Sequence, residues 1–173
     1  MMNPTPIFIE KCSIKNHKIF LKKISKMLKS YNSLIWIDID KFTQINNLFG
    51  KDCGDAIINT IIKILFNFTK RNDVEVYHAK KRDEFFIILR NYEFLSGYAQ
   101  IIISLIQQYD WSKIIPDMYI TCSAGIAEYG TSSIDTIKRA RVSLNLVKSK
   151  GGNGVGPEIF KLHPYELVRL SES

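Results

Sequence analysis

The sequence predicts an α+β fold in which helices flank an antiparallel β-sheet. Short apolar runs rich in β-branched residues alternate with longer segments whose apolar residues recur at helical spacing. Two of the short runs are separated only by a tight polar turn, which is typical of antiparallel neighbours. Because 46% of the 173 residues are hydrophobic, the chain can fill a domain core, and we expect a single domain over 1–173.

Each element is predicted from its local pattern. A basic helical lead-in is expected over 1–32 and the core over 33–162. Gly54 and Asp55 begin a helical pattern with Asp55 as the candidate N-cap, and a glycine pair at 151–152 closes the last helix. The other segments are expected as strands at 34–39, 74–78, 84–89 and 118–128, helices at 94–109 and 133–148, and an edge strand at 155–162.

The predicted order of the core elements is βαββαβ, preceded by an extra N-terminal helix. This is the split-βαβ or ferredoxin-like arrangement, an antiparallel sheet with its helices packed on one face. It makes the strands at 34–39 and 84–89 neighbours. It does not by itself predict a function, because this fold hosts many.

The formal net charge of +7 is largely carried by lysines near the N-terminus, beside an apolar stripe at helical spacing. We expect the solvated lysine face of a packed helix. A membrane-surface or nucleic-acid helix is the alternative, although no aromatic residues alternate with the lysines as a base-stacking platform requires. The lysines are Lys11, Lys15, Lys18, Lys22, Lys23, Lys26 and Lys29.

The expected location of the domain is cytoplasmic. No apolar run approaches the roughly 20 residues that a membrane span needs, and the N-terminus lacks a signal-peptide pattern. The three cysteines, Cys12, Cys53 and Cys122, form no CxxC pair. They therefore predict neither a disulfide framework nor a zinc site, which fits a reducing compartment.

Two pairs of acidic residues stand where strands begin or end. Asp38 and Asp40 alternate with isoleucines at the end of the first core strand, so both carboxylates share a face. Asp83 and Glu84 stand at the start of the neighbouring strand. Carboxylates that converge from adjacent strands suit Mg²⁺, which prefers oxygen ligands and is completed by nucleotide phosphates. The alternative is a set of solvated acids at strand ends.

The segment 42–55, FTQINNLFGKDCGD, follows the first of these pairs, and KRDEF at 81–85 contains the second. Together they resemble the GGDEF family, the bacterial diguanylate cyclase domains, whose segment is Phe-Lys-x-Ile-Asn-Asp-x-aromatic-Gly-His-x-x-Gly-Asp. The resemblance spans about residues 9–161. It implies a palm-like core of the kind predicted above.

The resemblance also implies roles for particular residues. The metal ligands would be the carboxylates of Asp38 and Asp83 and the backbone carbonyl of Ile39, with Mg²⁺ as the metal. Asn46 and Asp55 would bind guanine and Lys148 a phosphate, and in an active enzyme Asp83 and Glu84 would be catalytic. Asn46 and Asp55 also have a plainer interpretation as turn and helix caps, and Lys148 as a lysine favoured at a helix C-terminus.

Several positions depart from the family pattern. The glycine pair that names the family is Lys81 and Arg82 here, at a turn where a left-handed residue other than glycine costs about 1 kcal/mol or more. The family's phosphate-side lysine is Thr43 and its arginine is Gly152. Its inhibitory Arg-x-x-Asp aligns with 72–75, NDVE, so we expect no product inhibition there.

From these departures we expect a degenerate GGDEF domain in cyclic di-GMP signalling. It would lack cyclase activity, bind GTP with Mg²⁺, and regulate an attached or partner phosphodiesterase or sensor domain, with a homodimer as one arrangement. One alternative is an active cyclase that condenses two GTP molecules into cyclic di-GMP. Another is a protein-interaction module that binds no nucleotide. A nucleic-acid partner is not expected.

Overall fold

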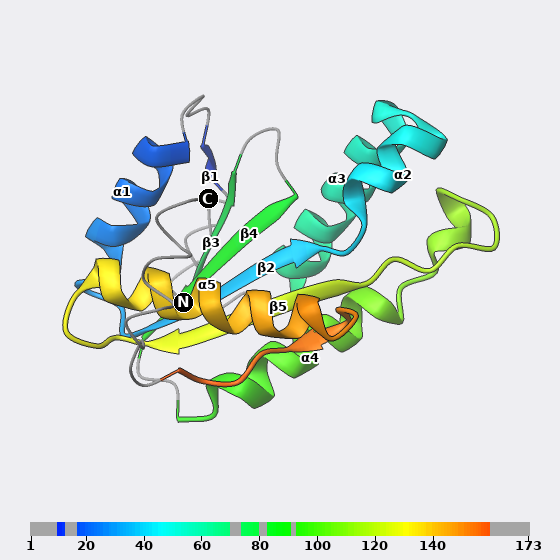
Figure 1. The fold of residues 1–173 in the computed structure, drawn as a ribbon. Coiled ribbons are helices and arrows are strands. Elements are labelled where there is room, and N and C mark those ends of the chain that lie inside the picture. The colour runs from blue at the N-terminus through cyan, green and yellow to red at the C-terminus, as the bar shows by residue number, and fades with distance from the viewer. Residues whose placement is uncertain (1–9, 13–16, 70–73, 80–82, 91–92, 160–173) are drawn as a thin grey trace, which may run out of the picture.

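The computed structural model describes residues 10–12, 17–69, 74–79, 83–90 and 93–159 (Figure 1). They form a six-stranded sheet in the order β1-β3-β4-β2-β5-β6 with helices on both sides. The strands are β1 (Glu10–Cys12), β2 (Ser33–Ile39), β3 (Val74–Ala79), β4 (Glu84–Leu89), β5 (Cys122–Glu128) and β6 (Gly154–Val155). The helices are α1 (His17–Met27), α2 (Phe42–Phe49), α3 (Lys51–Phe68), α4 (Leu95–Gln107), the 3-10 turn η1 (Trp111–Lys113) and α5 (Ser133–Ser149).

The four central strands have the predicted ferredoxin-like order. β2 pairs antiparallel with both β4 and β5, and β3 pairs antiparallel with β4. The edge strands β1 and β6 run parallel to their neighbours, so the whole sheet is mixed. The predicted α+β class and the neighbouring of β2 and β4 are confirmed, whereas β1 was not predicted because its three residues give no pattern.

Helices cover both faces of the sheet: the expected single helical face holds for the core helices α3 and α4, whereas α1 and α5 cover the opposite face. Alternate residues of β2 point to opposite sides because the side-chain period of a strand is two. Ile35 and Ile37 pack in the cluster formed with α3 and α4. Leu34 and Trp36 pack in a second cluster, with α1 and α5. The two core helices do share one face, and α1 and α5 close the other.

Three predicted boundaries are wrong. α3 begins at Lys51 with Gly50 as N-cap, so Asp55 lies within the helix and does not cap it. Gly54 is buried inside this helix because it packs against Asn46, where any Cβ would lie 2.0 Å from Asn46 Oδ1. The strand expected over 118–128 begins only at Cys122. The edge strand expected at 155–162 is the short β6, and the part of that range beyond 159 lies outside the described residues.

Within the part of the chain that the structure describes, no helix is both long and apolar enough to cross a membrane.

Candidate functional site

The neighbouring ends of β2 and β4 bring three predicted site residues together. Asp38 stands opposite Glu84 in the antiparallel register. One residue further along, the Ile39 N–H donates a hydrogen bond of 3.1 Å to the backbone carbonyl of Asp83. The negative charges of Asp83 and Glu84 both raise the pKa of Asp38, so the three carboxylates lie within electrostatic reach of one another. The structure therefore brings Asp38, Asp83 and Glu84 into one acidic cluster.

Lys148 supplies the positive charge of this cluster. It lies in the last turn of α5, and its ammonium donates a hydrogen bond to Asp38 Oδ1. The Asp38 side chain is 14% exposed and that of Lys148 35%. Burial raises the pKa of Asp38 to about 6, with Asp83 and Glu84 adding to the shift and Lys148 opposing it. An additional cation would stabilise the charged form of this carboxyl, because it would offset the effects of burial and of the acidic neighbours.

Asp40 has a different set of contacts. Its carboxylate accepts hydrogen bonds from Thr121 Oγ1 at 2.8 Å, Ser123 Oγ at 2.6 Å and the Asn153 N–H at 2.9 Å. These bonds attach the turn that follows α5 to the ends of β2 and β5. Asp40 therefore holds in place the segment that follows Lys148, a role that the sequence pattern did not predict.

Gly152 fits this turn because it has no side chain. Its φ is +79°, a backbone conformation that L-residues rarely adopt, and a Cβ there would lie 2.7 Å from Asp40 Oδ1. The position where the GGDEF pattern has arginine is thus one where, in this chain, a side chain conflicts with the Asp40 contacts.

Asn46 and Asp55 come from two consecutive helices. Asn46 lies in α2. The sequence did not predict this helix, because it is only eight residues long and half of them are polar. Its Oδ1 is buried beside Gly54 and has no hydrogen-bond partner among the described residues. Asp55 is exposed on the second turn of α3. An unsatisfied buried acceptor is costly, so Asn46 is a candidate for contact with a ligand.

Glu75, where the inhibitory aspartate would align, is engaged with two tyrosines. Tyr31 donates to Glu75 Oε1 at 2.6 Å, and Tyr77 donates to Oε2. Burial, followed by the bond to Glu75, raises the pKa of the Tyr31 phenol. Residues 72–73, Lys81 and Arg82 lie outside the described residues.

The acidic cluster could supply only some of the ligands of a metal ion. Among the described residues, no three His, Cys, Asp or Glu side chains are grouped to bind a metal ion. Asp38 and Asp83 with the Ile39 carbonyl would supply oxygen ligands alone. This set suits Mg²⁺, which uses one or two carboxylates and takes the rest of its ligands from phosphates and water. The residues present fit Mg²⁺ bound together with a phosphate-containing ligand.

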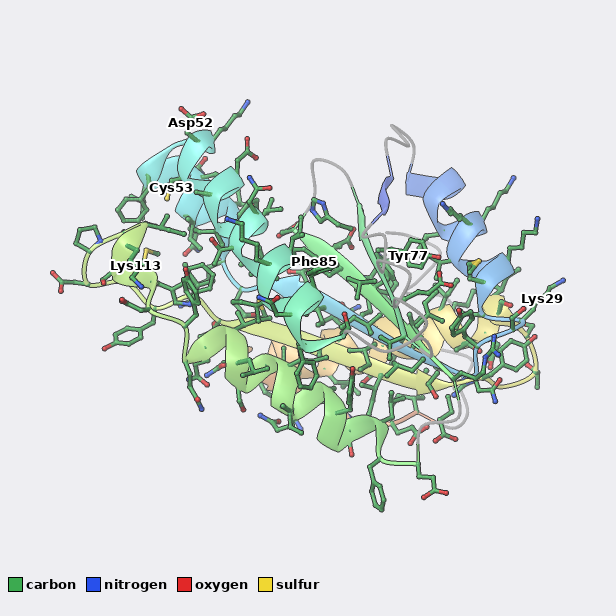
Figure 2. All side chains as sticks on the ribbon, turned by 180° about the vertical axis from the view of Figure 1, so that it is seen from behind. Lys29, Asp52, Cys53, Tyr77, Phe85 and Lys113 are labelled. Atoms are coloured by element: carbon green, nitrogen blue, oxygen red, sulfur yellow. The ribbon has the colours of Figure 1, made fainter. Side chains whose placement is uncertain are left out.

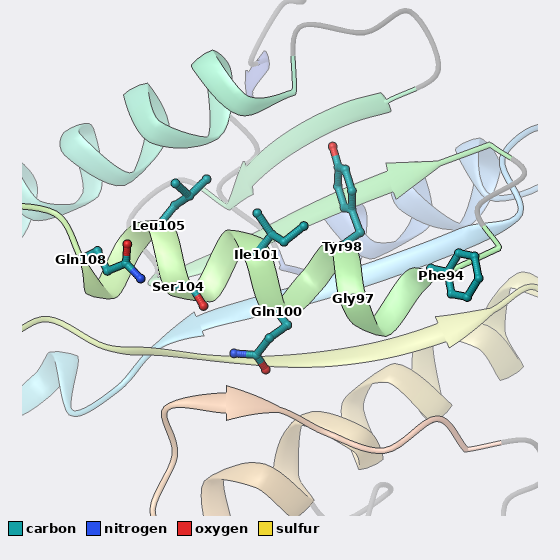
Figure 3. A pocket seen from close by; sticks show the side chains of 8 residues that line it. All are labelled: Phe94, Gly97, Tyr98, Gln100, Ile101, Ser104, Leu105 and Gln108. Carbon is teal, nitrogen blue, oxygen red and sulfur yellow. The ribbon is translucent and has the colours of Figure 1, made fainter.

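A separate apolar groove runs along the outer side of α4 (Figure 3). Phe94, Ile101 and Leu105 are exposed along it, and the buried Tyr98 also lines it. α4 covers the sheet face opposite to α5, so the groove does not include the acidic cluster or Lys148.

Comparison with known proteins agrees with the fold and the motifs. The profile of the family described as diguanylate cyclase, GGDEF domain, matches residues 11–154. The chain therefore belongs to the GGDEF family.

Among curated relatives, the chain is similar to diguanylate cyclase A of Treponema denticola, with 27% identity over 129 residues. It is also similar to the uncharacterized protein y4lL of Sinorhizobium fredii, with 25% identity over 129 residues. The matches cover 71% of this chain in both cases, but only 34% and 15% of those proteins. The chain thus spans about a third of one of these curated relatives and about a seventh of the other.

Solved structures share the fold. The active GGEEF domain of a diguanylate cyclase from Vibrio cholerae superposes with a TM-score of 0.65 at 23% identity, covering 83% of this chain and 92% of that one. The GGDEF domain of DgcB from Caulobacter crescentus, in complex with c-di-GMP, gives 0.70 at 21%, covering 82% and 89%. At these identities the similarity establishes the fold alone.

Proposed function

We propose that this GGDEF domain binds a guanine nucleotide with Mg²⁺, has lost cyclase activity, and regulates an attached or partner domain in cyclic di-GMP signalling. The main support for this proposal is the contact of Lys148 with the buried carboxyl of Asp38, beside Asp83 and Glu84. The proposed metal ligand, Asp38, and the proposed phosphate ligand, Lys148, thus lie side by side.

The acidic cluster and Lys148 together suit a metal–triphosphate complex. Mg²⁺ would be held by Asp38, Asp83 and the Ile39 carbonyl, and would offset the charge of phosphate oxygens when it is bound. Lys148 is partly exposed, and its ammonium can exchange the bond with Asp38 for one with phosphate. The α5 end that carries it is fixed by Asp40, so the ammonium is already positioned.

Guanine specificity is assigned to Asn46 and Asp55. A carboxylate accepts from the N1–H and N2–H groups of guanine, and an amide can serve the O6 or N3 side. The unsatisfied Asn46 Oδ1 and the exposed Asp55 support this assignment. Both residues keep the family identity and spacing in the sequence.

The loss of catalysis is inferred from the positions that surround the phosphates. The hairpin carries Lys81 and Arg82 where the family has two glycines, so large side chains occupy space that the triphosphate uses. Thr43 replaces a lysine, and Gly152 replaces an arginine that the Asp40 contacts leave no room for. In-line attack needs the α-phosphate in an accurate position, so misplacement removes turnover more readily than it removes binding.

The test combines calorimetry with a product assay. GTP and Mg²⁺ are titrated into the purified protein, and the mixture is then analysed for cyclic di-GMP and pyrophosphate. The proposal expects binding, with GTP preferred over ATP, and no product. Asp83→Ala should abolish the Mg²⁺ dependence of binding, whereas Asp117→Ala, a substitution in the loop before β5, should not. Absence of any binding would contradict the proposal and leave an interaction module.

An active cyclase is the second candidate, because Asp38 and Glu84 keep their places opposite each other in the register of β2 and β4. In that case two protomers would face each other, and the 3′-hydroxyl of each GTP would attack the α-phosphate of the other with release of pyrophosphate. Product that disappears in Asp83→Ala would establish this candidate and overturn the proposed loss of catalysis.

A further inference from the structure

The two sides of the sheet differ sharply in charge. Residues 11–37 contain seven lysines and no acid. The charge of this stretch is therefore as large as the formal net charge of the whole chain, +7. On the same side of the sheet, α1 and α5 together contain eight Lys or Arg and one acid, Asp135. On the other side, α2, α3 and α4 together contain two lysines and two aspartates. Among the helices that the structure describes, the excess positive charge therefore lies on the layer formed by α1 and α5.

The exposed part of α1 and the turn after it is a lysine stripe. Lys22, Lys26 and Lys29 are exposed at i, i+4 and i+7, while Ile24 and Leu28 are fully buried against the sheet. Lys29 projects from the end of this stripe into solvent (Figure 2). No Asp or Glu alternates with these lysines, as i, i+4 ion pairs on an ordinary solvated helix would require.

The exposed part of α5 repeats the pattern. Ile134, Lys138 and Arg141 also stand at i, i+4 and i+7, with Ile134 63% exposed and Arg141 partly exposed. The one acid of the helix, Asp135, is taken by the buried Arg139 at 2.8 Å, so it does not offset the exposed cations. α1 and α5 pack in the same cluster on the same face of the sheet (Figure 1).

We infer that this basic face, formed by Lys22, Lys26, Lys29, Lys138 and Arg141, binds the surface of a membrane that contains anionic lipids. Two helices in one layer can present their outer stripes to a flat surface at the same time. Each lysine near an anionic bilayer strengthens binding about fivefold, and the charge pattern requires no pocket or fixed register. The exposed Ile134 adds an apolar side chain beside the cations that can contact the lipid.

The face is less suited to nucleic acid. Four of its five cations are lysines, which act as point charges, whereas base recognition relies on the planar fork of arginine or on aromatic stacking. Among the described residues, neither exposed stripe contains an aromatic side chain. Lysine charge without base contacts is sufficient for an anionic lipid surface, and non-specific binding to a duplex backbone is the alternative that the test below separates.

The test is co-sedimentation of the full 173-residue chain with lipid vesicles. Vesicles of phosphatidylcholine mixed with phosphatidylglycerol are compared with vesicles of phosphatidylcholine alone, at low and at physiological ionic strength. We expect binding only to the anionic vesicles, weakened by salt. The variant Lys22→Gln/Lys26→Gln should bind at least about tenfold more weakly.

A matched control removes the same charge from the opposite side of the molecule. Lys63→Gln/Lys113→Gln changes two exposed lysines, one on α3 and one in η1 beside Trp111, which packs in the core cluster with α3 and α4. It should leave vesicle binding nearly unchanged. Equal losses in the two variants, or no binding of the wild type to anionic vesicles at low salt, would overturn the inference. So would tighter binding to duplex DNA than to vesicles in the same buffer. None of these outcomes depends on the nucleotide site.

Discussion

Lys148 and Asp38 are 110 positions apart in the sequence, yet the ammonium of Lys148 donates a hydrogen bond to Asp38 Oδ1. This bond joins the C-terminal end of α5 to the end of β2, next to Asp83 and Glu84. It partly compensates a carboxyl whose burial and acidic neighbours raise its pKa to about 6. The proposed nucleotide site is thus an arrangement of charges that a metal–phosphate ligand would complete.

Lys148→Gln is expected to lower the free energy of unfolding by about 1 kcal/mol, because the pair is partly exposed and screened by solvent. It should also raise the pKa of Asp38 further, since Lys148 opposes the shift. Urea unfolding and NMR titration of Asp38 measure the two effects. Lys150→Gln, in the exposed residue after α5, is the matched control and should change neither.

The pH dependence of stability has a defined sign at Asp38. Its pKa is raised from 3.8 to about 6 in the folded protein, so the folded state binds this proton more tightly than the unfolded state. The stability it contributes is fully present below the unfolded pKa and is lost as the pH rises through about 6. At about 1.4 kcal/mol per pKa unit, the loss approaches about 3 kcal/mol.

Asp38→Asn removes this titration, and its stability relative to the wild type should therefore increase from pH 4 to pH 7. Denaturant unfolding of both proteins across this range measures the difference. Added Mg²⁺ should reduce the difference at pH 7 if the cation binds Asp38. A difference that does not change with pH would contradict the assignment of the raised pKa to Asp38.

Gly152→Ala is expected to destabilise the protein by about 1 kcal/mol more than Gly151→Ala, because overpacking is added to backbone strain. Both glycines have positive φ, but a Cβ at 151 meets no atom within 4 Å, whereas a Cβ at 152 meets Asp40. Thermal unfolding of the two variants compares them directly. In the background of Asp40→Ala, most of the extra destabilisation by Gly152→Ala should disappear. Equal destabilisation by Gly151→Ala and Gly152→Ala in the wild type would show that the Asp40 contact is unimportant.

Asp55→Asn is expected to weaken GTP binding about tenfold, as the loss of a charge-assisted hydrogen bond to guanine would. ATP binding and the stability of the fold should not change, because Asp55 is exposed on α3. Asp52→Asn, in the first turn of the same helix, is the control. Equal weakening of GTP and ATP binding would argue against guanine recognition by Asp55.

Much of the fold could be predicted because its strands are buried. The run from Leu34 to Ile37 is apolar on both faces, since α3 and α4 cover one side of the sheet and α1 and α5 the other. The helix α2 could not be predicted, because only Ile45 of its residues is buried and the pattern is too short. The start of α3 was misplaced because Gly54 suggested a boundary, whereas its lack of a side chain serves close packing against Asn46.

The acidic cluster could be predicted in part. The pairing of β2 with β4 follows from the order of the elements, and it places Asp38 opposite Glu84. The contacts of Lys148 with Asp38 and of Asp40 with Thr121, Ser123 and Asn153 depend on how α5 and its following turn pack on the sheet. A single sequence contains no signal for such long-range pairs, because each partner has an adequate local explanation.

A calorimetric titration of GTP with Mg²⁺ into the protein, followed by analysis of the same mixture for cyclic di-GMP, tests the proposed function most directly. We expect saturable, Mg²⁺-dependent binding with no product. Formation of cyclic di-GMP would contradict the proposed loss of catalysis at Lys81 and Arg82, and the absence of binding would contradict the proposed nucleotide site at Asp38 and Lys148.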